Sequence, residues 1–301
     1  MTRVLVIRLG ALGDFIMSFG PFAAIRAHHP DAAITLLTTL PFAPMAAASP
    51  WFDQVAIDAR PAWWNLPGLA QLRGRLLGFD MVYDLQTSAR SNWYFHLAGR
   101  PSWSGNARGC SHPQIGAGRE TMHTIERQRD QLRRAGITEF PTPDLTFLTH
   151  RATPALPDRF ALLIPGASAH RPGKRWPASS YAVLAGIIAA KGITPVIIGG
   201  PDATPLAAEI AAACPSALDL TGKTALLDIF AMAARAAFVV GNDTGPTHCA
   251  AAAGCPAVVL FSHDSDPAMT APRGPGGTWP TVLRVPVLAD LPVARVAAAL
   301  P

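Results

Sequence analysis

The amino-acid sequence predicts an α/β protein built from two doubly wound, Rossmann-like domains that face each other. With 301 residues, the chain is about twice as long as a typical domain. Short β-branched runs alternate with longer Ala- and Leu-rich segments, which is typical of βαβ units and a parallel sheet. The pattern stops in the middle of the chain and then starts again, so we expect two such units.

The first half predicts an N-terminal domain over residues 1–150. A Pro- and Thr-rich segment without periodicity, residues 137–157, follows it and is typical of a linker. The expected strands are Val4–Arg8, Ala33–Thr38, Gln54–Ile57 and Met81–Asp84, and the expected helices are Phe15–His28, Leu66–Leu77 and Thr121–Ala135.

The second half repeats the alternation and predicts a C-terminal domain over residues 158–301. The sequence leaves two places for its last helix, Pro292–Leu300, which packs either on this domain or back on the first one. The expected strands are Phe160–Ile164, Pro195–Ile198, Ala217–Asp219, Phe238–Gly241 and Ala257–Phe261, and the other helices are Ser179–Lys191, Leu206–Ala213, Leu226–Ala234 and Thr247–Ala253.

Composition excludes several classes of protein. Half of the residues are apolar and 15% are charged, which excludes a disordered chain. Net charge is +5, with arginines concentrated in residues 100–134. This suits phosphate-bearing substrates, and no RNA-binding motif supports a nucleic-acid partner. The N-terminal apolar run is broken by Arg8 and Asp14, and no apolar run is long enough to span a bilayer, so we expect a cytoplasmic protein. None of the four cysteines forms a C-x-x-C pair.

Ligands of open parallel sheets bind beyond the C-terminal ends of the strands. The first expected strand runs into Arg8-Leu9-Gly10-Ala11-Leu12-Gly13-Asp14 at the start of a helix. The spacing is GxxG and not the GxGxxG of dinucleotide sites, and the second strand ends without an acidic residue, so a nicotinamide oxidoreductase is disfavoured. Asp14 is either an acid favoured by the helix dipole or a catalytic group in the cleft.

Two loops of the second half have the composition of phosphate cradles. Residues 166–177 combine Gly and Ser with Lys174 and Arg175 before a helix, and Trp176 is expected to anchor the lysine. Residues 241–248 place small residues at another helix start. Here His248 is either structural or a partner of a leaving phosphate, and Asp243 either orients the turn or performs chemistry.

The strand Met81–Asp84 is followed by Leu85-Gln86-Thr87-Ser88. Polar side chains at this strand end suit a hydroxyl-rich acceptor. A turn-capping role for Asp84 is the alternative.

Six segments, in order along nearly the whole chain, resemble glycosyltransferase family 9, the ADP-heptose:lipopolysaccharide heptosyltransferases. They are VLVIRLGALGD, FDMVYDLQTSARS, HTIERQRDQLRRAGI, GKRWP, LTGKTALLDIFAMAARAAFVVGNDTGPTHCAAAAGCPAVVLFS and DPAMTAPRGP. The resemblance implies a GT-B fold, an inverting mechanism, no metal or other cofactor, and an ADP-sugar donor bound by the C-terminal domain. Ser262-His263 departs from the small residues that are common in the family, which leaves the donor sugar open.

The resemblance also implies roles for individual residues. Asp14 matches the catalytic aspartate, and Lys174 matches the lysine that contacts the donor diphosphate. Asp243, Thr244, Gly245 and His248 match the donor-binding motif, with Asp202 and Thr224 placed near the ribose and adenine by position. The loop and strand-end positions add Arg175 as a further donor-binding candidate and Gly13, Asp84, Gln86 and Arg119 as acceptor-binding candidates.

The expected reaction follows from these roles. Asp14 takes the proton of an acceptor hydroxyl, and Lys174 with the N–H groups of Thr244–Thr247 stabilises the departing diphosphate in place of a metal. The string Asp264-Ser265-Asp266 is expected to lie outside this donor cradle. Arg100, Arg108 and Arg119 are either ordinary solvated arginines or contacts for an anionic, lipid-linked saccharide, and the second role implies transient contact with the inner face of the cytoplasmic membrane. Alternatives are a GT-B transferase with another nucleotide sugar and acceptor, and a binding protein without turnover.

Overall fold

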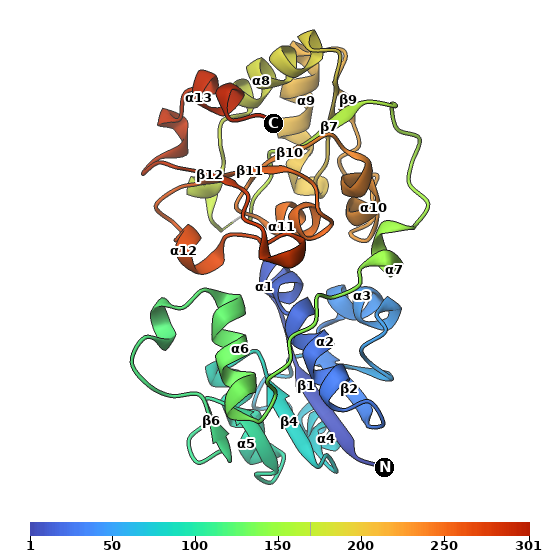
Figure 1. Ribbon diagram of the computed structural model, residues 1–301, viewed down its shortest axis with the longest axis vertical. Helices are drawn as coiled ribbons and strands as arrows, with labels where there is room; N and C mark the ends of the chain where they lie inside the picture. Colours follow the sequence, from blue (N-terminus) through green and yellow to red (C-terminus); the bar gives the residue numbers. More distant parts are fainter. Residues whose placement is uncertain (169) are drawn as a thin grey trace. The chain divides into compact units, whose positions relative to one another are not determined.

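A computed structural model describes residues 1–168 and 170–301 of the chain (Figure 1). The chain divides into two compact units, Met1–Pro143 (unit 1) and Asp144–Pro301 (unit 2). Each unit has one six-stranded sheet, ordered β3-β2-β1-β4-β5-β6 in unit 1 and β12-β11-β10-β7-β8-β9 in unit 2. All the strand pairs are parallel. This confirms two Rossmann-like units.

Both sheets have the strand order of dinucleotide-binding folds. When the strands of each unit are numbered from 1 to 6 along the chain, unit 1 has the order 3-2-1-4-5-6 and unit 2 has the order 6-5-4-1-2-3. The second is the same order read from the opposite edge of the sheet. The order changes direction between β1 and β4 in unit 1, and between β7 and β10 in unit 2. Ligands of such sheets bind beyond the strand ends at these switch points.

Unit 1 buries its central strands almost completely, and Leu5, Ile7 and Val82 are fully inaccessible. Its strands are β1 Arg3–Ile7, β2 Ala33–Thr38, β3 Gln54–Ile57, β4 Met81–Asp84, β5 Ser102–Gly105 and β6 His112–Pro113. Its helices are α1 Leu12–Met17, α2 Phe19–His28, α3 Ala43–Ala48, α4 Leu66–Leu76, α5 Ala89–Leu97 and α6 Thr124–Arg134, with short 3-10 helices at Leu40–Phe42 and Arg119–Thr121.

Unit 2 builds its core from the same kind of buried strands. The strands are β7 Phe160–Ile164, β8 Thr194–Ile197, β9 Leu218–Asp219, β10 Val239–Asn242, β11 Ala257–Phe261 and β12 Thr281–Arg284. The helices are α7 Thr146–Thr149, α8 Ala178–Ala190, α9 Thr204–Ala213, α10 Asp228–Arg235, α11 Gly245–Ala252, α12 Pro267–Thr270 and α13 Val293–Ala298, with 3-10 helices at Pro172–Lys174, Pro201–Ala203, Pro275–Gly277 and Leu288–Asp290.

The expected single helix Phe15–His28 is two helices, α1 and α2, which meet at Ser18. Pro21 has no N–H and cannot donate to the carbonyl of Met17, so the helical ladder is interrupted there. The Ser18 hydroxyl donates to the carbonyl of Asp14 at 2.8 Å, a bond that bends helices. The break ends α1 one turn after Asp14.

The units divide seven residues earlier than the expected end of the N-terminal domain, and part of the expected linker is folded into unit 2. Helix α7 contacts α10, and Leu148 is fully buried, which explains why this segment is structured. The last helix, α13, contacts α8 and buries Val296 in the unit 2 core.

Candidate functional site

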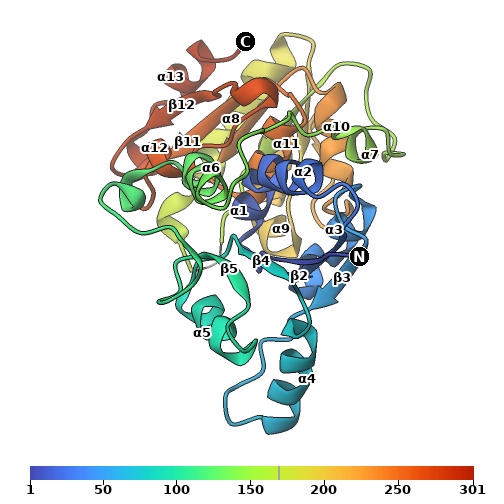
Figure 2. The same cartoon turned by 60° about the horizontal axis from the view of Figure 1, so that its bottom comes forward.

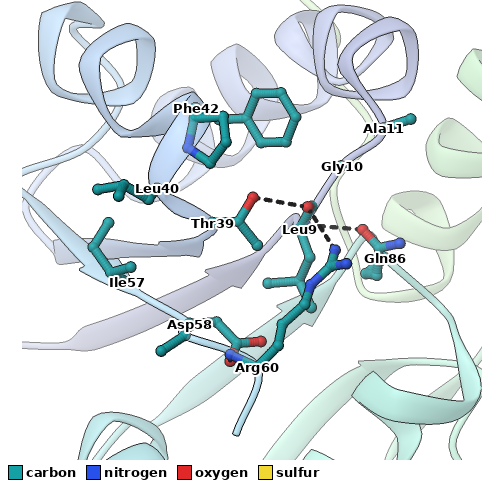
Figure 3. A pocket seen from close by; sticks show the side chains of 12 residues that line it. Leu9, Gly10, Ala11, Thr39, Leu40, Phe42, Ile57, Asp58, Arg60 and Gln86 are labelled. Atoms are coloured by element: carbon teal, nitrogen blue, oxygen red, sulfur yellow. Dashed lines mark hydrogen bonds between the residues drawn. The ribbon is translucent and has the colours of Figure 1, made fainter. Parts of the chain in front are cut away.

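The first site candidate is the turn that follows β1 at the switch point of unit 1. Gly10 has φ +125, a conformation that side chains disfavour, and a Cβ there would lie 2.9 Å from the Phe42 ring. Leu9 is held by three neighbours: its N–H donates to Gln86 Oε1 at 2.8 Å, and its carbonyl accepts from Thr39 Oγ1 at 3.2 Å and Arg60 Nη2 at 3.0 Å (Figure 3). The turn that leads to Asp14 is therefore fixed from three strands.

These contacts form one wall of a pocket of about 700 Å³ within unit 1 (Figure 3). It lies beyond the ends of β1, β2, β3 and β4, where the strand order changes. Its lining residues are Leu9–Ala11, Thr39–Phe42, Ile57–Arg60 and Gln86. Thr39 and Arg60 were not among the site residues predicted from the sequence. Both follow the C-terminal end of a strand, which is the position that pointed to Asp14.

Asp14 lies in the first turn of α1 with its side chain 36% exposed. Its Oδ1 is 3.4 Å from Nη2 of Arg8, a guanidinium that is almost fully buried. Burial lowers the pKa of Arg8, and the charge of Asp14 partly opposes that shift. Nη1 of Arg8 donates to the carbonyl of Leu85, which ties this cation to the end of β4. Asp14 thus combines access to solvent with a fixed positive partner.

The contacts of Asp84 favour the turn-capping alternative over the acceptor role. This residue is completely buried, and its Oδ1 accepts hydrogen bonds at 3.0 Å from the N–H groups of Gln86 and Thr87. Burial raises the pKa of Asp84 to about 6, against hydrogen bonds from Thr87, Ser91 and Gln86 and the charge of Arg8. Its role is to cap the turn after β4.

Arg119 is an anchored residue and not a solvated one. Its side chain is 13% exposed. It donates to Gln114 at 3.2 Å, to Glu120 at 2.8 Å and to Thr87 at 2.9 Å. Through Thr87 the arginine is connected to the turn after β4. Arg100 and Arg108, by contrast, are exposed.

The switch point of unit 2 carries a buried charged cluster. The Lys174 ammonium donates to Asp243 Oδ2 at 2.6 Å, and the Ser265 hydroxyl donates to the same oxygen at 2.7 Å. His248 Nε2 lies 3.5 Å from Asp243 Oδ1. Burial alone would raise the pKa of Asp243, but the hydrogen bond and charge of His248, with hydrogen bonds from Lys174 and Ser265, hold that pKa far below its usual range. Asp243 therefore stays ionised and orients its partners.

Asn242, the last residue of β10, connects this cluster to the neighbouring strand. Its Nδ2 donates to the carbonyl of Pro165 at 2.8 Å, and its Oδ1 accepts from the Trp176 N–H and the Tyr181 hydroxyl, both at 3.2 Å. Trp176 is buried and also donates Nε1 to the carbonyl of Leu291 at 3.0 Å. This anchors the segment that carries Lys174, as the sequence indicated.

The other expected donor residues lie in three places: beside Ala167, at the start of α11 and in the loop after β9. Arg175 donates to the carbonyl of Ala167 at 2.9 Å and lies 4.0 Å from Asp202. Thr244 precedes α11 and Gly245 is its first residue. Thr224 is half-buried in the loop after β9, and no described contact joins it to the charged cluster.

Two expectations for this site need correction. Of the N–H groups expected over Thr244–Thr247, Pro246 has none and Thr247 donates to the carbonyl of Thr244 at 3.0 Å, so those of Thr244 and Gly245 remain. The Asp264-Ser265-Asp266 string is not outside the cradle, because Ser265 is bonded to Asp243 and Asp264 packs against Gly173. Within residues 1–168 and 170–301, no group of three or more His, Cys, Asp or Glu side chains is arranged to hold a metal ion.

Two Rossmann-type units, each with polar groups at its switch point, define a protein of the GT-B class. The family Glycosyltransferase family 9 (heptosyltransferase) matches residues 70–279, well over half of the chain, and the protein belongs to this family of glycosyltransferases. Asp14 lies before the matched segment.

Individual relatives agree with the family. The chain is 25% identical to lipooligosaccharide heptosyltransferase 2 of Haemophilus influenzae over 87% of this chain and 84% of that protein. It is 24% identical to lipopolysaccharide heptosyltransferase 3 of Escherichia coli over 83% and 79%. Among solved structures, E. coli heptosyltransferase WaaC with ADP has a TM-score of 0.80 at 22% identity, covering 99% of this chain and 98% of that one. That likeness supports the fold.

Proposed function

We propose that the protein transfers a heptose-type sugar from an ADP-sugar to a saccharide of the lipopolysaccharide core or a related glycan, with inversion and without a metal ion. The observation that carries the proposal is the Lys174–Asp243–His248 cluster at the switch point of unit 2. Membership of the heptosyltransferase family and a structural neighbour described with ADP support the choice of donor.

Unit 2 is the donor-binding unit in this proposal. Asp243 fixes the Lys174 ammonium at the strand ends, where it meets the diphosphate of the donor. The N–H groups of Thr244 and Gly245 at the start of α11 and the Arg175 guanidinium add further donors for phosphate oxygens. His248 supports the turn through Asp243. Asp202 and Thr224 are assigned to the ribose and adenine.

Unit 1 is the acceptor-binding unit. Its pocket combines apolar walls with Gln86 and the Arg60 guanidinium, a mixture that suits a sugar with an anionic substituent. Gly13 lies in the same turn of α1 as Asp14, and Arg119 secures the neighbouring loop. Gly10 and Ala11 line the pocket, so the chain segment that delivers Asp14 is part of the acceptor site.

The reaction is a single displacement. The Asp14 carboxylate takes the proton of the acceptor hydroxyl while that oxygen forms a bond to the anomeric carbon. The bond between this carbon and the diphosphate oxygen breaks, and its electron pair leaves with ADP. Lys174 and Arg175 stabilise the charge that develops on the leaving group, which is the task a metal ion performs in other transferases. Attack opposite the diphosphate inverts the configuration.

The donor assignment is tested by calorimetric titration of ADP, UDP and GDP. We expect ADP to bind most tightly and Lys174→Ala to weaken its binding at least 10-fold, the scale of a lost charge-assisted contact of about 1.5 kcal/mol or more. Lys191→Ala, which removes an exposed lysine of unit 2, is the matched control. Equal ADP affinity in the Lys174 variant and the parent would remove this residue from the site. Transfer that stops in excess EDTA would contradict the metal-free reaction.

A transferase with another nucleotide sugar is the second candidate, because Ser262-His263 departs from the family pattern. The His263 ring is 68% exposed, and its Nδ1 lies 2.7 Å from the carbonyl of Pro286. The same titration decides between the two: tightest binding of UDP or GDP would favour this alternative. Within residues 1–168 and 170–301, no helix has both the length and the apolar character to cross a bilayer. We place the protein in the cytoplasm, in transient contact with the membrane.

A further inference from the structure

Unit 1 exposes an apolar loop between β3 and α4. Trp63, Trp64 and Leu66 are 77%, 78% and 72% exposed. Other tryptophans of the unit, Trp51 and Trp103, are buried in its core. We call residues 61–66 the tryptophan loop. Figure 2 shows α4, the helix that the loop begins, projecting from the body of unit 1. Two neighbouring indole rings held in water are an unfavourable arrangement unless they have an apolar partner.

The loop is a folded structure. The carbonyl of Pro61 accepts from Nη2 of Arg90 at 2.9 Å, and the N–H of Asn65 donates to the carbonyl of Ala62 at 2.8 Å. Asn65 also caps α4 by accepting from the N–H of Gly68 at 3.0 Å. Because both ends of the loop are fixed in this way, the two indole rings are presented outward by the fold.

Positive charge predominates around the loop, and the one carboxylate beside it, Asp58, is buried and lies 4.0 Å from Nε of Arg90. Residues 59–79 contain three arginines, Arg60, Arg73 and Arg75, and no Asp or Glu. Helix α5, which contacts α4, adds Arg90 and the partly exposed Trp93, again without an acidic residue. Arg75 donates to the carbonyl of Ile57 and Arg60 donates to that of Leu9, so these two are part of the fold, whereas Arg73 is exposed. The apolar loop is thus bordered by positive charge.

We infer that the tryptophan loop docks unit 1 onto the surface of a bilayer that contains anionic lipid. Trp is the side chain best suited to the membrane–water interface, because its ring is apolar and its N–H is polar. Bordering arginines are attracted to anionic headgroups. This inference rests on the proposed function for its biological purpose, since a lipid-linked acceptor lies at such a surface. Arg60 belongs to both the acceptor pocket and the base of the loop, so docking brings the pocket close to the headgroups.

The test is co-sedimentation of the full-length protein with two kinds of vesicle. One contains phosphatidylcholine alone, and the other contains phosphatidylcholine with about 30% phosphatidylglycerol. We expect the parent to sediment with the anionic vesicles, less so as salt increases. Trp63→Ser/Trp64→Ser should lower the partition coefficient at least 10-fold. Val183→Ser/Val287→Ser, a control that removes exposed apolar side chains of unit 2, should not change it. Because the indoles are exposed, the variant should fold, and an unchanged urea unfolding transition checks this.

Three results would overturn the inference. One is equal partition of the parent and the double Trp variant. A second is equal binding of the parent to neutral and anionic vesicles. The third is a concentration-dependent dimer in solution that the Trp variant abolishes, because the loop would then contact a second copy of the chain. Sugar transfer is not needed for any of these measurements, so vesicle binding without transfer would refute the proposed function and leave the docking loop intact.

Discussion

The switch points of the two sheets lie at equivalent places, between the first and fourth strands of each unit, and both contain a buried carboxylate. Asp84 ends β4 and Asp243 follows β10. Burial raises the pKa of Asp84 to about 6, whereas Lys174, His248 and Ser265 keep the pKa of Asp243 far below its usual range despite burial. The difference shows that the partners of a buried acid, and not its depth alone, decide in which direction its pKa moves.

A third carboxylate, Asp14, differs from both because it is partly exposed and has one cationic neighbour, Arg8, at 3.4 Å. Asp84 is completely buried and its Oδ1 accepts from two backbone N–H groups, and Asp243 has Lys174 and Ser265 on one oxygen and His248 near the other. A group that must accept a proton needs a free oxygen lone pair within reach of substrate. The comparison therefore supports our proposal that Asp14 is the catalytic base and that the other two position their neighbours.

The largest expected effect is on transfer by Asp14→Asn. Loss of a general base typically lowers the rate by 10²–10⁴-fold, and we expect about 10³-fold in kcat. Stability should change by less than about 0.5 kcal/mol, because a partly exposed ion pair contributes little. Steady-state kinetics measures the first effect and urea unfolding measures the second. Asp31→Asn, an exposed acid of unit 1, is the control. Full activity in the Asp14 variant would remove the residue from catalysis.

The second effect is on the stability of unit 2 in Asp243→Asn. Removing one partner from a buried pair leaves Lys174 uncompensated and costs about 3 kcal/mol. Hydrogen exchange of peptides from residues 172–181 and 243–252 should accelerate about 100-fold at neutral pH, while unit 1 peptides stay unchanged.

Acid should reduce this difference, because a lowered folded-state pKa stabilises the protein above the unfolded value of 3.8 and the contribution is lost as pH falls. Equal exchange in Asp243→Asn and the parent at neutral pH would mean that the carboxylate does not hold this cluster together.

The sequence was a good guide to the strands because they are short runs rich in apolar residues. Ala33–Thr38, Gln54–Ile57, Met81–Asp84, Phe160–Ile164 and Ala257–Phe261 have the predicted bounds. It missed α5, whose Ser88 and Ser91 form a capping box that could have marked its start. It also missed β5 and β12, since their short polar sequences become strands only by pairing with β4 and β11.

Within the site, the sequence predicted what lies next to a strand end and missed what arrives from elsewhere. Asp14, Lys174 and Asp243 were singled out from their own segments. The bond from Arg60 to Leu9 joins residues 51 apart, and that from Ser265 to Asp243 joins residues 22 apart. No local pattern encodes such contacts. The role of Asp84 was open for a similar reason, because a carboxylate at a strand end has the same sequence context whether it caps a turn or contacts a ligand.

The smallest expected effect tests the other half of the comparison, the raised pKa of Asp84. Its folded-state pKa of about 6 lies above the unfolded value of 3.8. The folded protein therefore binds the proton more tightly, and the stability that this provides is present below pH 3.8 and lost as pH rises through 6. In Asp84→Asn, which does not titrate, that loss is absent. Relative to the parent, the variant should gain on the order of 2 kcal/mol between pH 4 and pH 8.

Urea unfolding of parent, Asp84→Asn and Asp31→Asn at these two pH values isolates the pH-dependent part, whatever constant cost the amide itself adds. A stability difference between Asp84→Asn and the parent that stays constant with pH would show that Asp84 is ionised in the folded state like Asp243. The buried Arg8 guanidinium would then compensate the charge of Asp84, as Lys174 and His248 compensate that of Asp243 in unit 2. The two switch points would differ only in geometry.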